Sequence, residues 1–174
     1  MVSDQKLTAN DTLTNLIKNK GISTWKSLLS YTKELPYGRN SNRTDFSSVI
    51  MEQKGSCSSK HAFLKKVADL NNIPDVKLIL GMYQMNEKNT PGISNVLTEN
   101  SIDFIPEAHC YLKINDKRTD ITSLKDNIEN LEKDILEEIE ITPEQVVDFK
   151  VKYLQEFLKN WIIKNNIKHS FKSL

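Results

Sequence analysis

The chain has 174 residues and carries 24 lysines and arginines against 23 aspartates and glutamates, a formal net charge of +1. This length suits one domain with its own hydrophobic core, and the balanced charge argues against a dedicated nucleic-acid-binding protein, which needs excess positive charge on one face. Two cysteines are too few for a disulfide scaffold, no apolar run approaches the ~20 residues of a membrane span, and residues 1–10 lack the apolar core of a secretory signal. We therefore expect a cytoplasmic protein with neither a membrane nor a nucleic acid as partner.

Two short helices are predicted near the N-terminus. Asp11 is a favoured N-cap type for the first of them, and Ser23 is one for the second. Residues 35–43 are rich in turn-forming residues, and Asp45 is placed to cap a short helix that ends before Gly55.

The segment after Gly55 places a cysteine at the predicted start of a helix. Ser56 is a favoured N-cap type, and apolar residues then recur at helical spacing over residues 57–71. Cys57 is therefore expected in the first turn, where the helix dipole favours the thiolate and lowers a pKa that starts near ~8.5 in free cysteine. Such a thiolate is a candidate nucleophile.

An extended apolar run over residues 76–85 predicts a central, mostly buried strand. Residues 86–105 are polar, and a connection of this length is uncommon unless it is functional or disordered. Since it leads to a second predicted strand that starts near residue 107 and contains His109, we expect it to act as a lid or specificity loop. A turn and a further extended segment then bring in Asp120.

The C-terminal part becomes acidic and then helical. Residues 135–141 alternate weakly, as in an edge strand, and residues 142–145 form a capping box with proline at the first helical position. The final helix is predicted at about 143–165, and it is followed by a basic end. The basic residues are Lys164, Lys168, His169 and Lys172.

The order of Cys57, His109 and Asp120 resembles that of the transglutaminase-like superfamily of papain-fold cysteine enzymes, over roughly residues 35–122. In that family a Gly-x-Cys turn opens the nucleophile helix, a Gly-Ile-Pro-like turn closes it, an aromatic residue follows the His, and an Asp-x-Thr comes next. The corresponding segments here are Gly55-Ser56-Cys57, Asn72-Ile73-Pro74, His109 with Tyr111, and Asp120-Ile121-Thr122.

The resemblance implies an α+β fold with a papain/transglutaminase-like core, in which the nucleophile helix packs on a small antiparallel sheet. Additional helices lie at the N- and C-termini. It implies a single domain over residues 1–174, with the core at about 35–122 and the C-terminal helix at about 143–165.

The chemistry implied by the resemblance is acyl transfer through a thioester, on an amide bond of a peptide or protein and without a cofactor. His109 serves as the base for Cys57, and Asp120 binds the other ring nitrogen and sets its tautomer. An aromatic or amide side chain upstream of the cysteine completes the oxyanion hole in this family, so Tyr37 is the candidate donor. We expect hydrolysis rather than cross-linking, because few aromatic residues are available to wall a water-excluding tunnel for an amine.

Other interpretations use the same residues. Cys57, His61, His109 and Cys110 are the ligand types of a zinc site, but neighbours on a strand point to opposite faces, so at most three of them converge. His61 competes as a base from one turn along the helix, yet it has no evident orienting carboxylate. A buried, inert cysteine is a further alternative, as is an inactive transglutaminase-like fold that acts as a protein-binding module.

Overall fold

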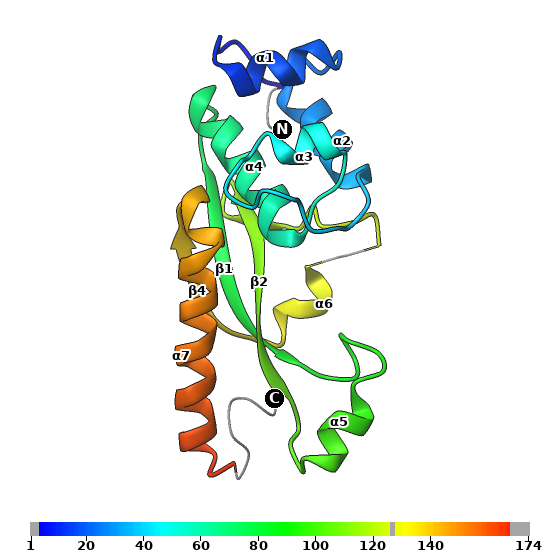
Figure 1. Ribbon diagram of the computed structural model, residues 1–174, viewed down its shortest axis with the longest axis vertical. Helices are drawn as coiled ribbons and strands as arrows, with labels where there is room; N and C mark the ends of the chain where they lie inside the picture. Colours follow the sequence, from blue (N-terminus) through cyan, green and yellow to red (C-terminus); the bar gives the residue numbers. More distant parts are fainter. Residues whose placement is uncertain (1–3, 126–127, 168–174) are drawn as a thin grey trace.

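The computed structural model describes residues 4–125 and 128–167, which form an α+β fold around a four-stranded antiparallel sheet (Figure 1). The strands are β1 (Val76–Met85), β2 (Ile105–Ile114), β3 (Lys117–Thr119) and β4 (Ile135–Ile141). Their order in the sheet is β3-β2-β1-β4. The expected α+β class with a small antiparallel sheet is confirmed, and so is the edge strand at residues 135–141.

Helices cover the sheet at its ends and along one side. In the described residues they are α1 (Thr12–Asn19), α2 (Trp25–Glu34), α3 (Ser48–Glu52), α4 (Cys57–Leu70), α5 (Ser94–Glu99), α6 (Glu129–Glu132), a 3₁₀ helix (Pro143–Val146) and α7 (Asp148–Lys164). Helices α1 to α4 gather at one end of the elongated molecule, α5 lies at the other end, and α7 runs lengthwise beside the sheet (Figure 1). No helix in this described part is long and apolar enough to cross a membrane.

Helix α4 packs against β1 and β2 and forms the centre of the main hydrophobic core. The fully buried side chains of this contact are Ala62, Phe63, Leu64 and Val67 on the helix and Leu78, Leu80, Cys110 and Leu112 on the strands. Successive residues of a strand point to opposite faces, so His109 and Tyr111 lie on the face away from α4. There Tyr111 packs with Ile79 and Ile128.

The edge of β2 explains how a residue on that far face meets the start of α4. Strand β3 pairs with residues 112–114 of β2. Strand β3 therefore does not cover the edge of β2 beside His109. The N-terminus of α4, which begins at Cys57, lies at this edge.

Most predicted element boundaries agree with the structure, but two predicted caps are wrong. The helix start at Cys57 with Ser56 as N-cap and the strand at 76–85 are confirmed. The second helix is capped by Thr24, whose hydroxyl accepts from the Ser27 N–H at 3.3 Å, and not by Ser23. Asp45 is not the cap of α3; its carboxylate holds the turn before it.

The final helix begins later than predicted. The capping box of Thr142 and Gln145 is present, but it caps the 3₁₀ turn, and Val147 at φ −101° and ψ −92° separates that turn from α7. Of the predicted basic end, Lys164 closes α7. The other three basic residues, Lys168, His169 and Lys172, lie outside the described residues.

Residues 86–105 are not a structureless lid over the cysteine. They contain α5, and its Leu97 packs with Ile105 and with Leu158 of α7. Figure 1 shows α5 at the opposite end of the molecule from α1 to α4. Helix α5 therefore covers the far end of the sheet. It is not placed to act as a lid or specificity loop over Cys57.

Candidate active site

Local backbone geometry positions Cys57 as the first residue of α4. The Ser56 hydroxyl accepts from the Ser59 N–H at 3.3 Å, and the Ser59 hydroxyl accepts from the Ser56 N–H at 2.9 Å, which completes a capping box. The N–H groups of the first turn have no acceptor within a helix, so the Cys57 N–H remains available to a ligand. Cys57 itself is half-buried.

A fully buried lysine holds the segments around this turn together. The Lys60 ammonium donates to the Leu35 carbonyl at 2.5 Å and to the Thr122 carbonyl at 2.7 Å. Gly55 is required beside it, because an added Cβ would lie 2.7 Å from Lys60 Cγ. Lys60 thus anchors both the loop before Cys57 and the loop after Asp120 to α4.

His109 of β2 and Asp120, which follows β3, form a short hydrogen bond. His109 Nε2 donates to Asp120 Oδ2 at 2.7 Å. The other carboxylate oxygen accepts from the Thr122 N–H at 2.8 Å and from the Thr122 hydroxyl at 2.6 Å. With Nε2 engaged, Nδ1 is the ring nitrogen left for the Cys57 sulfur. The structure therefore brings together all three of the predicted residues.

The electrostatics favour a charged pair at neutral pH. Burial raises the pKa of the Cys57 thiol, but hydrogen bonding to His109 and the positive charges of Lys150 and His109 outweigh it and lower the pKa to about 6. Burial lowers the pKa of His109, but the hydrogen bonds to Asp120 and Cys57 raise it to about 10. Between these two values, Cys57 is a thiolate and His109 an imidazolium.

His61 has a structural role and is not available as a base. Its Nδ1 donates to the Cys57 carbonyl at 2.7 Å, and its Nε2 accepts from the Ile121 N–H at 2.8 Å. Both ring nitrogens are occupied in the neutral form, and burial lowers the His61 pKa to about 4. The ring ties the segment after Asp120 to α4.

The second cysteine lies on the other face of β2. The Cys110 sulfur is buried in the main core and accepts from the Ser58 hydroxyl at 3.6 Å. Burial raises the pKa of this thiol to about 11. No group of three or more potential metal ligands occurs among residues 4–125 and 128–167.

Lys150, in the first turn of α7, is a site residue that sequence reasoning missed. Its ammonium lies 3.9 Å from Cys57 Sγ and donates to the Ser58 hydroxyl at 3.0 Å. Burial lowers the pKa of Lys150, but the negative charge that Cys110 or Cys57 carries when it is ionised raises it. No local pattern marks this lysine, because it reaches Cys57 across 93 positions of the chain.

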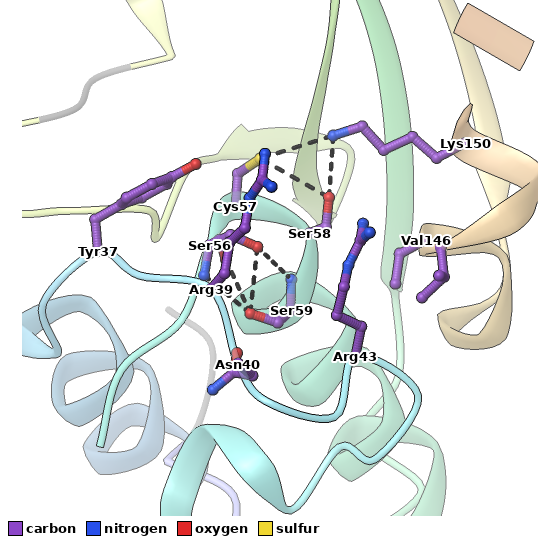
Figure 2. A pocket seen from close by; sticks show the side chains of 11 residues that line it. Tyr37, Arg39, Asn40, Arg43, Ser56, Cys57, Ser58, Ser59, Val146 and Lys150 are labelled. Atoms are coloured by element: carbon purple, nitrogen blue, oxygen red, sulfur yellow. Dashed lines mark hydrogen bonds between the residues drawn. The ribbon is translucent and has the colours of Figure 1, made fainter. Parts of the chain in front are cut away.

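A cavity of about 120 Å³ opens beside the cysteine (Figure 2). Its lining residues are Tyr37, Arg39, Asn40, Arg43, Ser56, Cys57, Ser58, Ser59, Val146, Val147 and Lys150. Tyr37 pairs with Gly55 as an isolated β-bridge, and the Gly38 N–H donates to the Gly55 carbonyl at 3.2 Å. Figure 2 shows the Tyr37 hydroxyl pointing toward Cys57 from the side opposite Lys150.

The cavity therefore gives a small molecule or a chain segment access to the thiol. Tyr37 is 64% exposed, so its hydroxyl is not committed to the core. Comparisons of the chain with protein-family models, with curated proteins and with solved structures give no match.

Proposed function

We propose that the protein is a cysteine-dependent acyl-transfer enzyme with a papain/transglutaminase-like core, and that it acts on amide or peptide bonds through a thioester. Cys57 is the nucleophile, His109 the acid and base, and Asp120 the group that orients the imidazole. The observation that carries this proposal is the 2.7 Å contact between His109 and Asp120, beside a thiol at a helix start that opens to a cavity.

In the first half-reaction the Cys57 thiolate adds to the carbonyl carbon and forms a tetrahedral oxyanion. The Cys57 N–H and the Tyr37 hydroxyl are the donors that we assign to this oxygen. His109 gives its proton to the leaving amine as the C–N bond breaks, and a thioester remains. In the second half-reaction neutral His109 takes a proton from water, hydroxide adds to the thioester, and collapse releases the acid and the thiolate.

Water is the acyl acceptor that the cavity favours. Transfer to an amine requires exclusion of water and an apolar path for an aliphatic second substrate. Among the described residues Tyr37 is the one aromatic side chain that lines the cavity, and the other lining groups are mainly serines and cations. A site of this polarity admits water readily, which supports hydrolysis over cross-linking.

The test offers glutamine-containing peptides to the protein with and without an excess of a labelled primary amine. Hydrolysis is expected, detected as a mass change at the peptide without incorporation of the label, and it is lost in Cys57→Ala. Dominant incorporation of the label would reverse the assignment of the acceptor. An unreactive Cys57 together with no turnover would instead favour a protein-binding module.

Tyr37→Phe tests the oxyanion donor in the same assay. Loss of one such donor lowers kcat about 100-fold, with little change in Cys57 alkylation, because the thiolate does not depend on it. Unchanged kcat would remove Tyr37 from the site.

A further inference from the structure

Two arginines lie on the rim of the Cys57 cavity. Arg39 and Arg43 both line the cavity and are exposed. Neither guanidinium forms an ion pair or a hydrogen bond with any residue in the part of the chain that the structure describes. Arg118, the other arginine of the chain, pairs with Glu138 and Glu132. Both guanidiniums that lack a partner among the described residues thus lie at the proposed site.

The cavity lining contains a third cation. Lys150 approaches Cys57 from α7, and within residues 4–125 and 128–167 no aspartate or glutamate belongs to the lining. Glu107 acts on Lys150 electrostatically, but it lies outside the lining. The positive end of α4 points into the same space. A ligand in this cavity therefore meets three cationic side chains beside the Cys57 thiolate.

One carboxylate that contacts the arginine loop, that of Glu52, is already engaged. Glu52 accepts from the Ser41 N–H at 3.0 Å and from the Ser41 hydroxyl at 2.5 Å, and it lies 3.6 Å from the Lys54 ammonium. It is therefore not the missing counter-charge of Arg39 and Arg43.

The loop that carries the arginines is held in place. Asn40 is buried, and its amide donates to the Ser48 carbonyl at 3.3 Å and to the Lys54 carbonyl at 3.0 Å. In Figure 2 the side chains of Arg39 and Arg43 extend from this loop toward the start of α4 and toward Val146. The guanidiniums are thus presented to the cavity by an anchored backbone.

We propose that the site takes acyl donors that carry a carboxylate close to the reacting carbonyl, recognised by Arg39 and Arg43. Guanidinium groups bind carboxylates through paired, charge-assisted hydrogen bonds. The carboxylate belongs either to an acidic side chain beside the scissile bond or to the free end of a peptide. This inference rests on the proposed acyl-transfer function, because only that function makes the ligand an acyl donor. The preference of the site for an anion is measurable without turnover.

The first test compares two alkylating agents of similar shape, anionic iodoacetate and neutral iodoacetamide. Modification of Cys57 is followed by mass spectrometry of the native chain, and the same chain in urea supplies the reference ratio of the two rates. Like charge disfavours iodoacetate at an ordinary thiolate. We expect the ratio of iodoacetate to iodoacetamide rates at Cys57 to exceed the reference and to decline as salt is added.

Arg39→Gln and Arg43→Gln are each expected to lower this ratio about two- to five-fold, since partly solvated charge pairs contribute modestly. Lys26→Gln on α2 removes the same charge from outside the cavity lining and leaves the ratio unchanged. A native ratio equal to the reference, or one that neither arginine variant changes, overturns the proposal.

Peptide substrates then distinguish the two sources of the carboxylate. Matched pairs carry Asp or Asn beside the scissile amide, or a free or amidated C-terminus, and the favoured pair identifies the source. Equal or faster turnover of the neutral member in both pairs overturns the carboxylate inference and leaves the acyl-transfer proposal standing. An intact iodoacetate preference without turnover of any peptide supports the anion site and contradicts the acyl-transfer proposal.

Discussion

Two networks of charged side chains lie on the same face of the sheet, two residues apart on β2. One joins His109 to Asp120 and Cys57. The other joins Tyr111 to Glu138, which also accepts from Lys113 at 2.8 Å and from Arg118 at 2.8 and 3.0 Å. The rings of His109 and Tyr111 stack with centroids 6.2 Å apart, so the networks are in contact.

The two networks perturb pKa values in similar ways but differ in access. Hydrogen bonds from cations hold the pKa of each carboxyl, Asp120 and Glu138, well below its usual range, against the effect of burial. The Glu138 network satisfies itself, because three donors converge on one carboxylate. The thiol of the Cys57 network faces a cavity instead. A perturbed pKa therefore marks a candidate functional site only where the group can meet a ligand.

Gly81 is packed tightly against Tyr111 of the Glu138 network. An added Cβ at Gly81 would lie 2.8 Å from Tyr111 Cε1 and 2.9 Å from its hydroxyl oxygen. Glu138 stands opposite Gly81 in the register of β1 and β4. The missing side chain thus leaves the space through which Tyr111 reaches Glu138.

The largest effect that separates the networks is expected from Asp120→Asn. The amide keeps an oxygen for Thr122 but offers His109 no negative charge and the wrong hydrogen-bond partner, so the imidazole loses its orientation. We expect turnover to fall about 1,000- to 10,000-fold. Steady-state assays with the peptide substrates measure the loss.

Asp116→Asn in the exposed turn after β2 is the matched control for that variant and is expected to retain full turnover. Thermal unfolding shows whether each variant folds. Turnover near that of the original chain in a folded Asp120→Asn protein would contradict the triad assignment.

His109→Ala tests the thiolate itself. In the original chain, Cys57 alkylation by iodoacetamide should increase as the pH rises through about 6, where the thiol loses its proton, and then level off. Without the imidazolium the thiol returns toward its ordinary pKa, so we expect the alkylation rate at pH 7 to drop about 100-fold.

Cys110 is the internal control, because burial raises its pKa to about 11 and it stays slow throughout this range. Equal rates at both cysteines in the native protein would show that Cys57 is not activated.

Lys150→Met should have a smaller effect in the same direction. The ammonium favours the thiolate by its charge but forms no short contact with sulfur, at 3.9 Å. We expect alkylation at pH 6 to slow by about three- to ten-fold and its pH midpoint to rise. Lys152→Met on the same helix is the control and is expected to have no effect. An unchanged pH midpoint in Lys150→Met would show that Lys150 interacts with Ser58 but does not influence the thiol.

Short-range signals explain which parts of this site were predictable from the sequence. Gly55, Ser56 and Cys57 carry a turn, a cap and a helix start within three positions, and strand alternation separates His109 from Cys110. The structure agrees with both. The role of Lys150 depends on how α7 packs against β2, and no local pattern encodes that packing.

The same limit applies to the buried Lys60 and to the cap at Thr24. Lysine is a charged residue type, so Lys60 is expected on the surface from the sequence. In the structure, hydrogen bonds to two carbonyls from distant loops compensate the cost of burying its ammonium. Ser23 and Thr24 are both good cap types. The choice between them follows from the bridge between Thr24 and Lys6, a tertiary contact.

The smallest effect on the thiol is expected from Glu138→Gln, although this variant removes the centre of the second network. Alkylation of Cys57 should change less than about two-fold, because the Glu138 charge is absent from the main influences on its pKa. Stability should decline instead, since Arg118 and Lys113 lose their counter-charge. With all three side chains partly solvated, we expect a loss of about 1–2 kcal/mol in the free energy of unfolding.

The pH dependence of that loss follows from the pKa of Glu138, which the Arg118 hydrogen bond lowers from 4.5 to about 2 despite burial. A carboxyl with a lowered pKa in the folded state stabilises the protein above its unfolded pKa and loses this effect as the pH falls. The difference between the original chain and Glu138→Gln should thus be largest above about pH 5 and should shrink toward pH 2 in urea unfolding. Glu140→Gln removes the same charge from an exposed position of the same strand and should be neutral. Slower Cys57 alkylation in Glu138→Gln alone would show that the two networks are coupled through the stacked rings of His109 and Tyr111.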